Sequence, residues 1–178
     1  MIMQGEQRIA ASREVVWAAL NDAEVLKAAI PGCQQIEKVS DTEMTAKVKL
    51  KIGPISATFG GKVTLSDLDP PNGYTISGEG SGGVAGFAKG GALVRLVEEG
   101  PEQTMLTYEV KADVGGKIAQ LGSRLIDATA KKLAGEFFDN FADVVAPPEP
   151  DAETAKMDDG EAAKKKGWFR TMFAKKAG

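Results

Sequence analysis

The sequence predicts an α+β fold in which a curved antiparallel sheet of about seven strands wraps around one long C-terminal helix. Segments that alternate apolar and polar residues fill the middle of the 178-residue chain, and this period of two is typical of strands with one buried face. An apolar repeat at steps of three and four follows them over residues 115–145, which indicates a long amphipathic helix. Because such a helix must bury its apolar stripe, the strands before it are expected to cover it.

The first elements are one strand and two short helices. Residues 4–10 alternate weakly and are expected to form an edge strand. Ser12 offers a hydroxyl that can cap the next helix, and Glu14 suits the positive end of that helix. A second helical segment covers residues 24–29 and ends before the Pro31-Gly32 turn.

Most of the sheet is expected from the middle of the chain. In residues 43–52, apolar residues alternate with Thr45 and three lysines, so the lysine face should be exposed to solvent. The turns at 53–54, 69–73 and 99–102 are rich in glycine and proline and separate consecutive strands. The strands that they delimit are expected at residues 43–52, 55–68, 74–80, 92–98 and 104–114.

Glycines within these elements indicate places where side-chain volume is avoided. Residues 78–91 are rich in glycine, which predicts either a mobile hairpin with kinked strands or the mouth of a cavity. Gly122 and Gly135 fall inside the predicted long helix, where each glycine costs about 1 kcal/mol relative to alanine. We therefore expect that the protein needs space beside that helix.

Composition excludes several classes of function. A net charge of −3 and a pI near 5.2 argue against a nucleic-acid-binding protein. No apolar run reaches the length of about eighteen residues needed to span a bilayer, and no signal peptide is evident, so a cytoplasmic location is expected. The chain has one cysteine and no histidine. Catalytic triads that need histidine are therefore excluded, a Cys/His metal site is not expected, and we predict no catalytic residues and no metal.

Three segments resemble a known family. They are residues 16–22 (VWAALND), residues 30–33 (IPGC) and residues 114–122 (VGGKIAQLG). Together with the order of elements they resemble the CoxG family, named for the G subunit of carbon monoxide dehydrogenase, which belongs to the START-like (SRPBCC) helix-grip superfamily. The resemblance extends over residues 4–145. Family members often have a proline after the aspartate that ends the first helix, whereas Ala23 follows Asp22 in this chain.

The resemblance implies a function as well as a fold. It implies that residues 1–145 form a ligand-binding domain with an elongated apolar cavity between the sheet and the long helix. Proteins of this family accompany molybdenum-containing carbon monoxide dehydrogenases or related molybdenum hydroxylases and help to couple them to the membrane. By this resemblance the chain is expected to carry out no chemistry, to have no covalently bound cofactor, and to bind a respiratory quinone such as ubiquinone or menaquinone, or another lipid.

The inward faces of the predicted strands and helix supply an apolar wall without a carboxylate, as a quinone or prenyl tail requires. Tyr108 can donate a hydrogen bond to a quinone carbonyl, or its hydroxyl can lie at the rim of the sheet. The alternative interpretation is that these residues fill an ordinary core. The residues expected to line the cavity are Phe59, Gly61, Val63, Ile76, Phe87, Val94, Tyr108, Leu121, Gly122, Leu125 and Ile126.

The composition changes after residue 145. Residues 146–166 are rich in proline and acidic residues and are expected to form a disordered linker. Residues 167–178 and the lysines before them combine positive charge with large apolar side chains, which is typical of a helix that binds an anionic membrane surface. Docking of this tail on a partner protein is the alternative. The residues expected to bind the cytoplasmic face of the inner membrane are Lys164, Lys165, Lys166, Trp168, Phe169, Arg170, Met172, Phe173, Lys175 and Lys176.

The sequence therefore predicts a non-enzymatic, ligand-binding accessory protein that recruits a molybdenum hydroxylase to the membrane. Two other hypotheses stay open. In one, the core is filled and the protein is only a recruitment adaptor. In the other, the chain is a START-like enzyme of the cyclase or hydrolase type. An apolar tunnel would argue against the adaptor, and two inward polar residues that face each other would support the enzyme.

Overall fold

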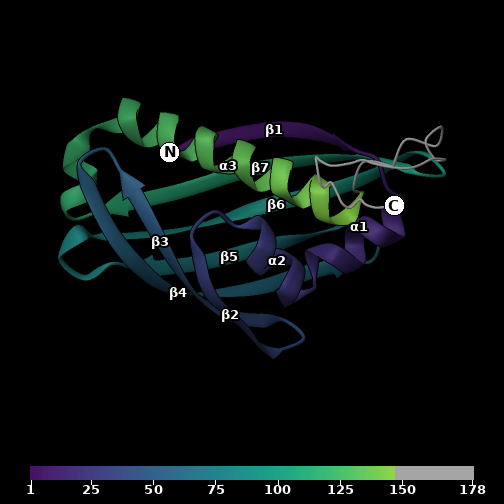
Figure 1. The fold of residues 1–178 in the computed structure, drawn as a ribbon, viewed down its shortest axis with the longest axis horizontal. Coiled ribbons are helices and arrows are strands. Elements are labelled where there is room, and N and C mark those ends of the chain that lie inside the picture. Colours follow the sequence, from purple (N-terminus) through teal and green to yellow (C-terminus); the bar gives the residue numbers. More distant parts are fainter. Residues whose placement is uncertain (147–178) are drawn as a thin grey trace, which may run out of the picture. The chain divides into compact units, whose positions relative to one another are not determined.

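The computed structural model describes residues 1–146 and confirms the predicted fold class (Figure 1). The predictions for the linker beyond Ala146 and for the membrane-binding tail lie outside the described residues. The elements are β1 (Ile2–Ile9), α1 (Arg13–Leu20), α2 (Ala23–Ala29), β2 (Cys33–Ser40), β3 (Glu43–Ile52), β4 (Ile55–Asp69), β5 (Gly73–Ser81), β6 (Phe87–Gly100), β7 (Gln103–Gly115) and α3 (Ser123–Val145), with 3₁₀ turns η1 (Gly83–Ala85) and η2 (Lys117–Leu121).

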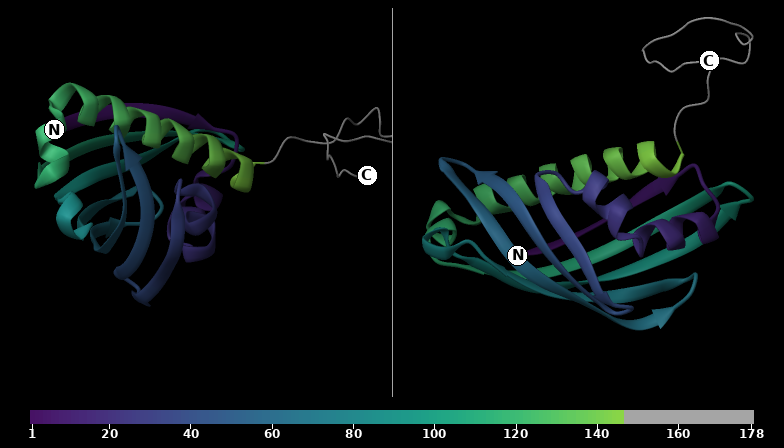
Figure 2. Two further views of the ribbon diagram at one scale, coloured as in Figure 1. Left: turned by 60° about the vertical axis from the view of Figure 1, so that its left-hand side comes forward. Right: turned by 60° about the horizontal axis from the view of Figure 1, so that its bottom comes forward.

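The seven strands form one antiparallel sheet in the order β1-β7-β6-β5-β4-β3-β2. Strands β2 to β7 follow one another as a meander. Strand β1 pairs with β7 and forms the edge of the sheet opposite β2. The sheet curves around α3, which lies across its concave face (Figure 2). The predicted alternation is confirmed in β3 and β4, since Met44 and Leu65 are buried while Lys47 and Lys49 are exposed.

Side-chain caps start the two short helices. The Ser12 hydroxyl accepts a hydrogen bond from the amide of Val15 at 3.2 Å, and the Asp22 carboxylate accepts one from the amide of Glu24 at 2.9 Å. Each cap satisfies a backbone donor that the first turn of a helix leaves unpaired. Only Asn21 and Asp22 separate α1 from α2, and both helices lie at one end of the concave face (Figure 2).

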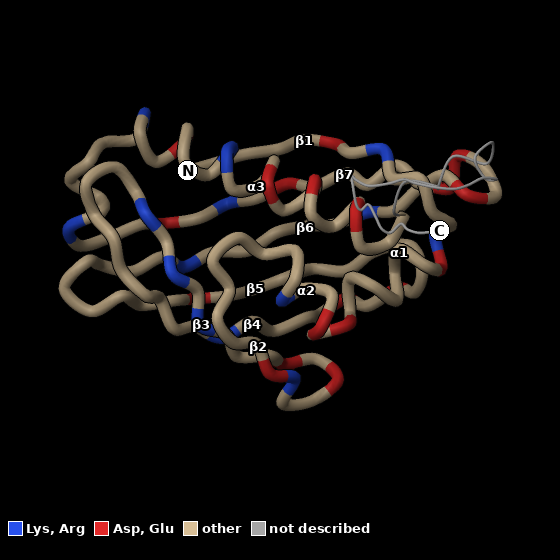
Figure 3. The backbone as a smooth tube through the Cα atoms, viewed as in Figure 1, with Lys and Arg blue, Asp and Glu red and all other residues tan. Residues whose placement is uncertain are grey.

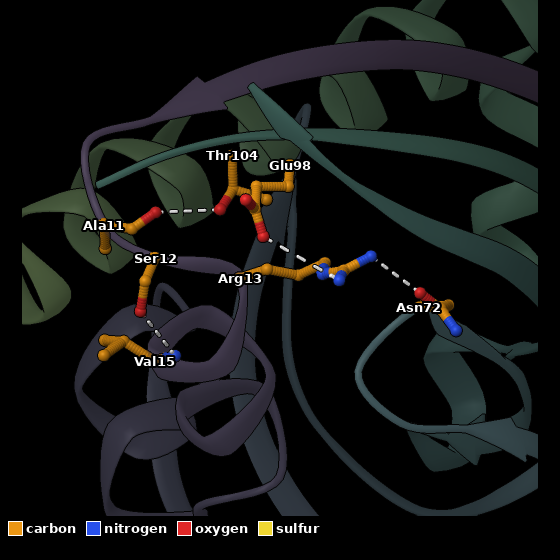
Figure 4. Close-up of polar contacts among 7 residues, drawn as sticks. All are labelled: Ala11, Ser12, Arg13, Val15, Asn72, Glu98 and Thr104. Atoms are coloured by element: carbon orange, nitrogen blue, oxygen red, sulfur yellow. Dashed lines mark hydrogen bonds and ion pairs between the residues drawn. The ribbon is translucent and has the colours of Figure 1, made fainter. Parts of the chain in front are cut away.

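Polar contacts hold the start of α1 against the turns of the sheet (Figure 4). The guanidinium of Arg13 donates to the side-chain oxygen of Asn72 at 2.8 Å and lies 3.8 Å from the carboxylate of Glu98. The buried hydroxyl of Thr104 donates to the carbonyl of Ala11 at 2.8 Å. These contacts link α1 to the β4–β5 and β6–β7 turns, so one end of the domain is closed.

The long helix begins later than the sequence predicts. Residues 117–121 form η2, and α3 starts at Ser123 because Gly122 between them adopts a φ of +94°. The prediction that Gly122 lies inside the helix is therefore wrong, and its glycine is explained by a backbone conformation that L-residues avoid. Gly135 does lie inside α3, but it is exposed and a Cβ there would meet no atom within 4 Å. Neither glycine marks a close approach to the helix.

Packing holds α3 mainly at its C-terminal half. Phe141 is fully buried, and the amide of Asn140 donates to the carbonyl of Ala29 at the end of α2 at 3.1 Å. Leu125 and Ile126 in the first turns are only partly buried. The first half of the helix therefore bridges the concave face with less packing beneath it.

The glycine-rich segment is largely strand. Strand β6 begins at Phe87, five residues earlier than the predicted start at residue 92, and includes Gly90 and Gly91. Gly78 and Gly80 belong to β5. The connection between these strands is confined to residues 82–86.

Candidate ligand-binding cavity

An apolar cavity of about 300 Å³ lies between the concave face of the sheet and α3, at the end covered by α1 and α2. We call it the inner chamber. Apart from two tyrosines, its lining is aliphatic, Met or Phe. The lining residues are Met3, Leu20, Leu26, Ile30, Ile36, Met44, Ala46, Val63, Leu65, Tyr74, Ile76, Ala92, Val94, Leu106, Tyr108, Val110, Ala134, Phe137 and Phe138.

A second cavity of about 450 Å³, the outer chamber, adjoins the first and is more open to solvent. It extends along the sheet to Leu50 and Phe59, and Leu133 of α3 borders it. The two chambers are adjacent and share part of their lining. The shared residues are Ile30, Ala46, Val63, Ile76, Ala92 and Val110.

Small residues form the floor of the outer chamber. Gly61 pairs with Gly80 and Gly80 with Ala88, so one row across β4, β5 and β6 carries almost no side-chain volume. A Cβ at Gly61 would overlap the carbonyl oxygen of Glu79, which shows that neighbouring strands approach closely at this position. A Cβ at Gly80 would meet its nearest atom at 3.6 Å. Gly61 is therefore required by the backbone, whereas Gly80 leaves space open.

Aromatic rings form the wall of the inner chamber on the helix side. Tyr108 of β7 stacks on Phe138 with ring centroids 5.3 Å apart, and Phe138 meets Phe137 edge to face at 5.0 Å. Gly5 of β1 pairs with Tyr108, and a Cβ at Gly5 would lie 2.6 Å from the tyrosine hydroxyl. The glycine on the neighbouring strand thus makes room for the phenol.

Tyr74 and Tyr108 are the residues with polar side-chain groups in the lining of the inner chamber. The register places Tyr74, Val94 and Tyr108 in one row across β5, β6 and β7. Neither hydroxyl makes a hydrogen bond to another residue of the described range 1–146. Burial raises the pKa of the Tyr74 phenol well above its ordinary value, so it stays protonated at neutral pH. A phenol hydroxyl is both a donor and an acceptor, so either tyrosine can donate a hydrogen bond to a ligand.

Charged side chains belong to the opposite face of the sheet. Lys62, Glu79, Lys89 and Asp113 form one row across β4 to β7, and all four are exposed. This position agrees with the prediction that the inward face of the sheet carries no carboxylate. Within residues 1–146, no group of three potential metal ligands occurs.

Several of the residues predicted to line the cavity do so, and others do not. Those that line one or both chambers are Phe59, Gly61, Val63, Ile76, Val94 and Tyr108. Those outside the lining of both chambers are Phe87, Leu121, Gly122, Leu125 and Ile126.

The later start of α3 accounts for Leu121 and Gly122, whereas Leu125 and Ile126 belong to the first turn of the helix, which lies outside both chambers. The helix residues that reach the chambers are Leu133, Ala134, Phe137 and Phe138, two to four turns beyond the predicted Leu125. Leu121 and Leu125 instead lie against Gly53 in the β3–β4 turn. In the case of Phe87, the side chain is 50% exposed and its ring lies over Gly115.

Some lining residues were not predicted from the sequence. Tyr74 and Ile76 alternate with Thr75, so the pattern already placed Tyr74 on the inner face with Ile76, and this signal was sufficient to find it. Phe138 follows Phe137 outside the apolar stripe, and Leu26 and Ile30 belong to a short helix whose position depends on tertiary packing. A period in the sequence does not identify these three residues.

The architecture defines the class of protein: a curved antiparallel sheet that holds a long helix over an apolar cavity is a helix-grip domain of the START-like type. Residues 5–146 match the CoxG family, which is described as the G subunit of carbon monoxide dehydrogenase. The chain belongs to this family, as its sequence segments indicated.

Solved structures agree with this assignment. A conserved protein from Geobacillus kaustophilus is similar at 29% identity, with a TM-score of 0.77 over 82% of this chain and 95% of that one. A START superfamily protein from Mycobacterium smegmatis shares 15% identity, with a TM-score of 0.62 over 81% and 96% of the two chains. The Zhui aromatase/cyclase from Streptomyces sp. R1128 shares 13% identity, with a TM-score of 0.60 over 82% and 93%. The last two similarities concern the fold alone.

No curated protein matches the sequence. The fold is shared with an aromatase/cyclase, whereas the family name denotes a component of another enzyme. Among the described helices, none has both the length and the hydropathy of a membrane span.

Proposed function

We propose that this protein is a non-enzymatic accessory protein that holds a hydrophobic ligand, a respiratory quinone or a lipid, in its two chambers. In this proposal it couples a molybdenum hydroxylase of the carbon monoxide dehydrogenase type to the inner membrane. The observation that carries the proposal is the pair of adjoining apolar chambers, the inner of which has Tyr74 and Tyr108 as the polar residues of its lining.

The inner chamber suits the ring of a quinone. Phe137, Phe138 and Tyr108 offer flat apolar surfaces, and aromatic rings pair favourably in offset or edge-to-face arrangements. A quinone has two carbonyl acceptors and no donor, which complements two phenols that can donate. An uncompensated polar group in an apolar cavity would be unfavourable. A ligand with carbonyl oxygens therefore satisfies Tyr74 and Tyr108 better than a pure hydrocarbon does.

The outer chamber suits an isoprenoid or acyl chain. Its floor of glycine and alanine leaves a shallow apolar channel, and it opens to solvent. A quinone placed with its ring in the inner chamber can extend its tail along this floor. About 0.8 kcal/mol is gained for each CH₂ group that leaves water, so a tail of several isoprene units contributes strongly to affinity.

Chamber chemistry favours binding over catalysis. The lining of the inner chamber provides no carboxylate, amine or imidazole for proton transfer, and burial raises the pKa of the Tyr74 phenol well above its ordinary value, which makes it a poor acid near neutral pH. A cyclase or hydrolase function has less support for this reason. The recruitment-only hypothesis requires a filled core, and cavities of about 300 and 450 Å³ argue against it.

The partner enzyme and the attachment to the membrane are inferred from observations other than the cavity. The family name indicates the partner, a carbon monoxide dehydrogenase or a related molybdenum hydroxylase. The basic and aromatic residues of the segment 167–178 are typical of a helix that binds a membrane, and we propose that they attach the protein to the cytoplasmic face of the inner membrane.

The test is to purify the full chain from a respiring host and to identify bound molecules by solvent extraction and native mass spectrometry. We expect one quinone or lipid per chain. Ala134→Phe places a ring in the inner chamber and should remove the ligand, whereas Ala128→Phe makes the same change on the exposed side of α3 and should not. If all forms are empty and stay empty after incubation with ubiquinone and menaquinone, the carrier function is refuted.

A further inference from the structure

The meander separates the strand connections into two ends with opposite charge. Consecutive antiparallel strands place alternate turns at opposite ends of the sheet. At one end lie the β2–β3, β4–β5 and β6–β7 turns. Carboxylates gather there (Figure 3), and they come from Asp41, Glu43, Asp67, Asp69, Glu98, Glu99 and Glu102.

The other end, which we call the basic end, consists of the β3–β4 turn, residues 82–86 and residues 116–122. None of these connections contains an aspartate or glutamate. Lys51, Lys117 and Arg124 lie within or beside them and are exposed. The lysines of β3 continue this positive charge along the neighbouring strand (Figure 3).

Large apolar side chains are exposed at the basic end. Val84 in η1 is 88% exposed, the highest value among the large apolar residues of the described chain, and Phe87 is 50% exposed. Val84 belongs to η1, which contacts the η2 segment that contains Lys117, and the ring of Phe87 lies over Gly115, two residues before Lys117. Apolar side chains that project beside cations are the arrangement that an anionic membrane surface accepts.

The outer chamber extends toward the same end. Leu50 and Phe59, on the two strands joined by the β3–β4 turn, line it. Gly82 in the β5–β6 connection lies over the ring of Phe59, and a Cβ there would be 2.8 Å from that ring. An apolar ligand that leaves a bilayer at the basic end would therefore have a short path into the protein.

We propose that the basic end of the folded domain docks on an anionic lipid bilayer, with Val84 and Phe87 in the interfacial region and the outer chamber turned toward the lipid. The acidic end then points away from the membrane, because the negative surface potential that attracts Lys51, Lys117 and Arg124 repels its carboxylates. α3 runs from the basic end to the α1–α2 end of the domain, so residue 146 lies at the acidic end and the contact proposed for the basic end is separate from attachment by the tail. The inference concerns a surface of the domain, so it can be tested without any ligand in the cavity.

The first measurement places an environment-sensitive fluorophore at a single cysteine in the full chain. Cys33→Ser removes the native thiol, and the probe is attached to Val84→Cys or, as a matched control, to Val39→Cys beside the acidic β2–β3 turn. Val39 is 60% exposed, so both positions accept a label. With vesicles of phosphatidylglycerol and phosphatidylcholine, we expect a blue shift at position 84 and quenching there by spin-labelled lipid, with neither effect at position 39.

The second measurement tests the charge. Lys51→Glu with Lys117→Glu should weaken vesicle binding of the full chain by about tenfold or more, since each basic residue near such a surface contributes about 1 kcal/mol. Lys27→Glu with Lys132→Glu makes the same change in net charge elsewhere on exposed positions and should have a much smaller effect.

The proposal is overturned if position 84 stays in water while the full chain is bound to vesicles, because the tail alone then makes the contact and the basic end is free for a protein partner. Equal shifts at positions 84 and 39 would also overturn it, since they would mean that the domain has no preferred orientation. Neither outcome depends on whether the cavity holds a quinone, so failure of this inference is distinct from failure of the proposed function.

Discussion

Replacing Gly80 by valine should stabilise the protein and abolish ligand binding at the same time. Gly80 lies within β5 on the floor of the outer chamber, and a Cβ there would make only ordinary contacts, the nearest at 3.6 Å. Its neighbours in the adjacent strands are Gly61 and Ala88. The added methyl groups would therefore project into empty apolar space.

Two effects contribute to the expected gain in stability. Glycine in a strand interior is destabilising by roughly 0.5–1 kcal/mol relative to alanine, and burying a valine side chain contributes about 1.5–3 kcal/mol. Gly60→Val is the matched control, because Gly60 lies in the adjacent strand on the exposed face and a Cβ there meets no atom within 4 Å. The control should show only the first effect. The two variants should therefore differ by about 2 kcal/mol.

Thermal unfolding of the ligand-free full chain measures this difference. For a domain of this size, 2 kcal/mol corresponds to roughly 6 °C in Tm. Ligand titration of the same preparations should show binding by wild type and Gly60→Val and none by Gly80→Val.

The reasoning is refuted if Gly80→Val melts below Gly60→Val, because the floor would then be packed and the outer chamber would not be a real space. Retention of full ligand affinity by Gly80→Val would show that the ligand does not use this chamber.

Further predictions concern single positions. Gly122→Ala should lower the free energy of unfolding by about 1–2 kcal/mol, because Gly122 has a φ of +94° that alanine avoids. Gly135→Ala should raise it by about 1 kcal/mol, because Gly135 lies inside α3 with open space around it. Denaturant titration measures both changes, and changes of the same sign would contradict this reasoning. Tyr108→Phe should leave Tm almost unchanged and weaken quinone binding about threefold to tenfold, the loss expected for one hydrogen bond, and unchanged binding would show that the hydroxyl is not used. The pKa of Tyr74 is raised above its ordinary value of 10.0, so ionisation favours the unfolded chain. Stability is therefore fully present below pH 10 and should fall above it, and a Tyr74→Phe variant with an equally steep fall would contradict this cause.

Local periodicity predicted the faces of the strands. Met44, Val63 and Leu106 lie on the concave side as their alternation indicates, because a strand with one buried face leaves little freedom in register. The CoxG assignment was also available from sequence, since residues 114–122 form part of a segment specific to that family.

The depth of the cavity was not predictable in the same way. Whether Gly80 leaves open space or Gly61 avoids a carbonyl depends on how neighbouring strands approach, and both glycines look alike in the sequence. The helix start was misplaced for a related reason. The apolar repeat of residues 115–145 continues through η2, so only the positive φ of Gly122 shows where α3 begins.

The pairing of β1 with β7 has a consequence for folding in the cell. The amino group of Met1 donates to the carbonyl of Ala112 at 2.9 Å, across 111 residues of sequence. Ribosomes add roughly 5–20 residues per second, so the first strand emerges on the order of ten seconds before its partner. Pairing across so long a separation is entropically demanding and is expected to be slow. The concave apolar face is therefore uncovered during synthesis until α3 arrives, and chaperones have their main opportunity to act during this interval.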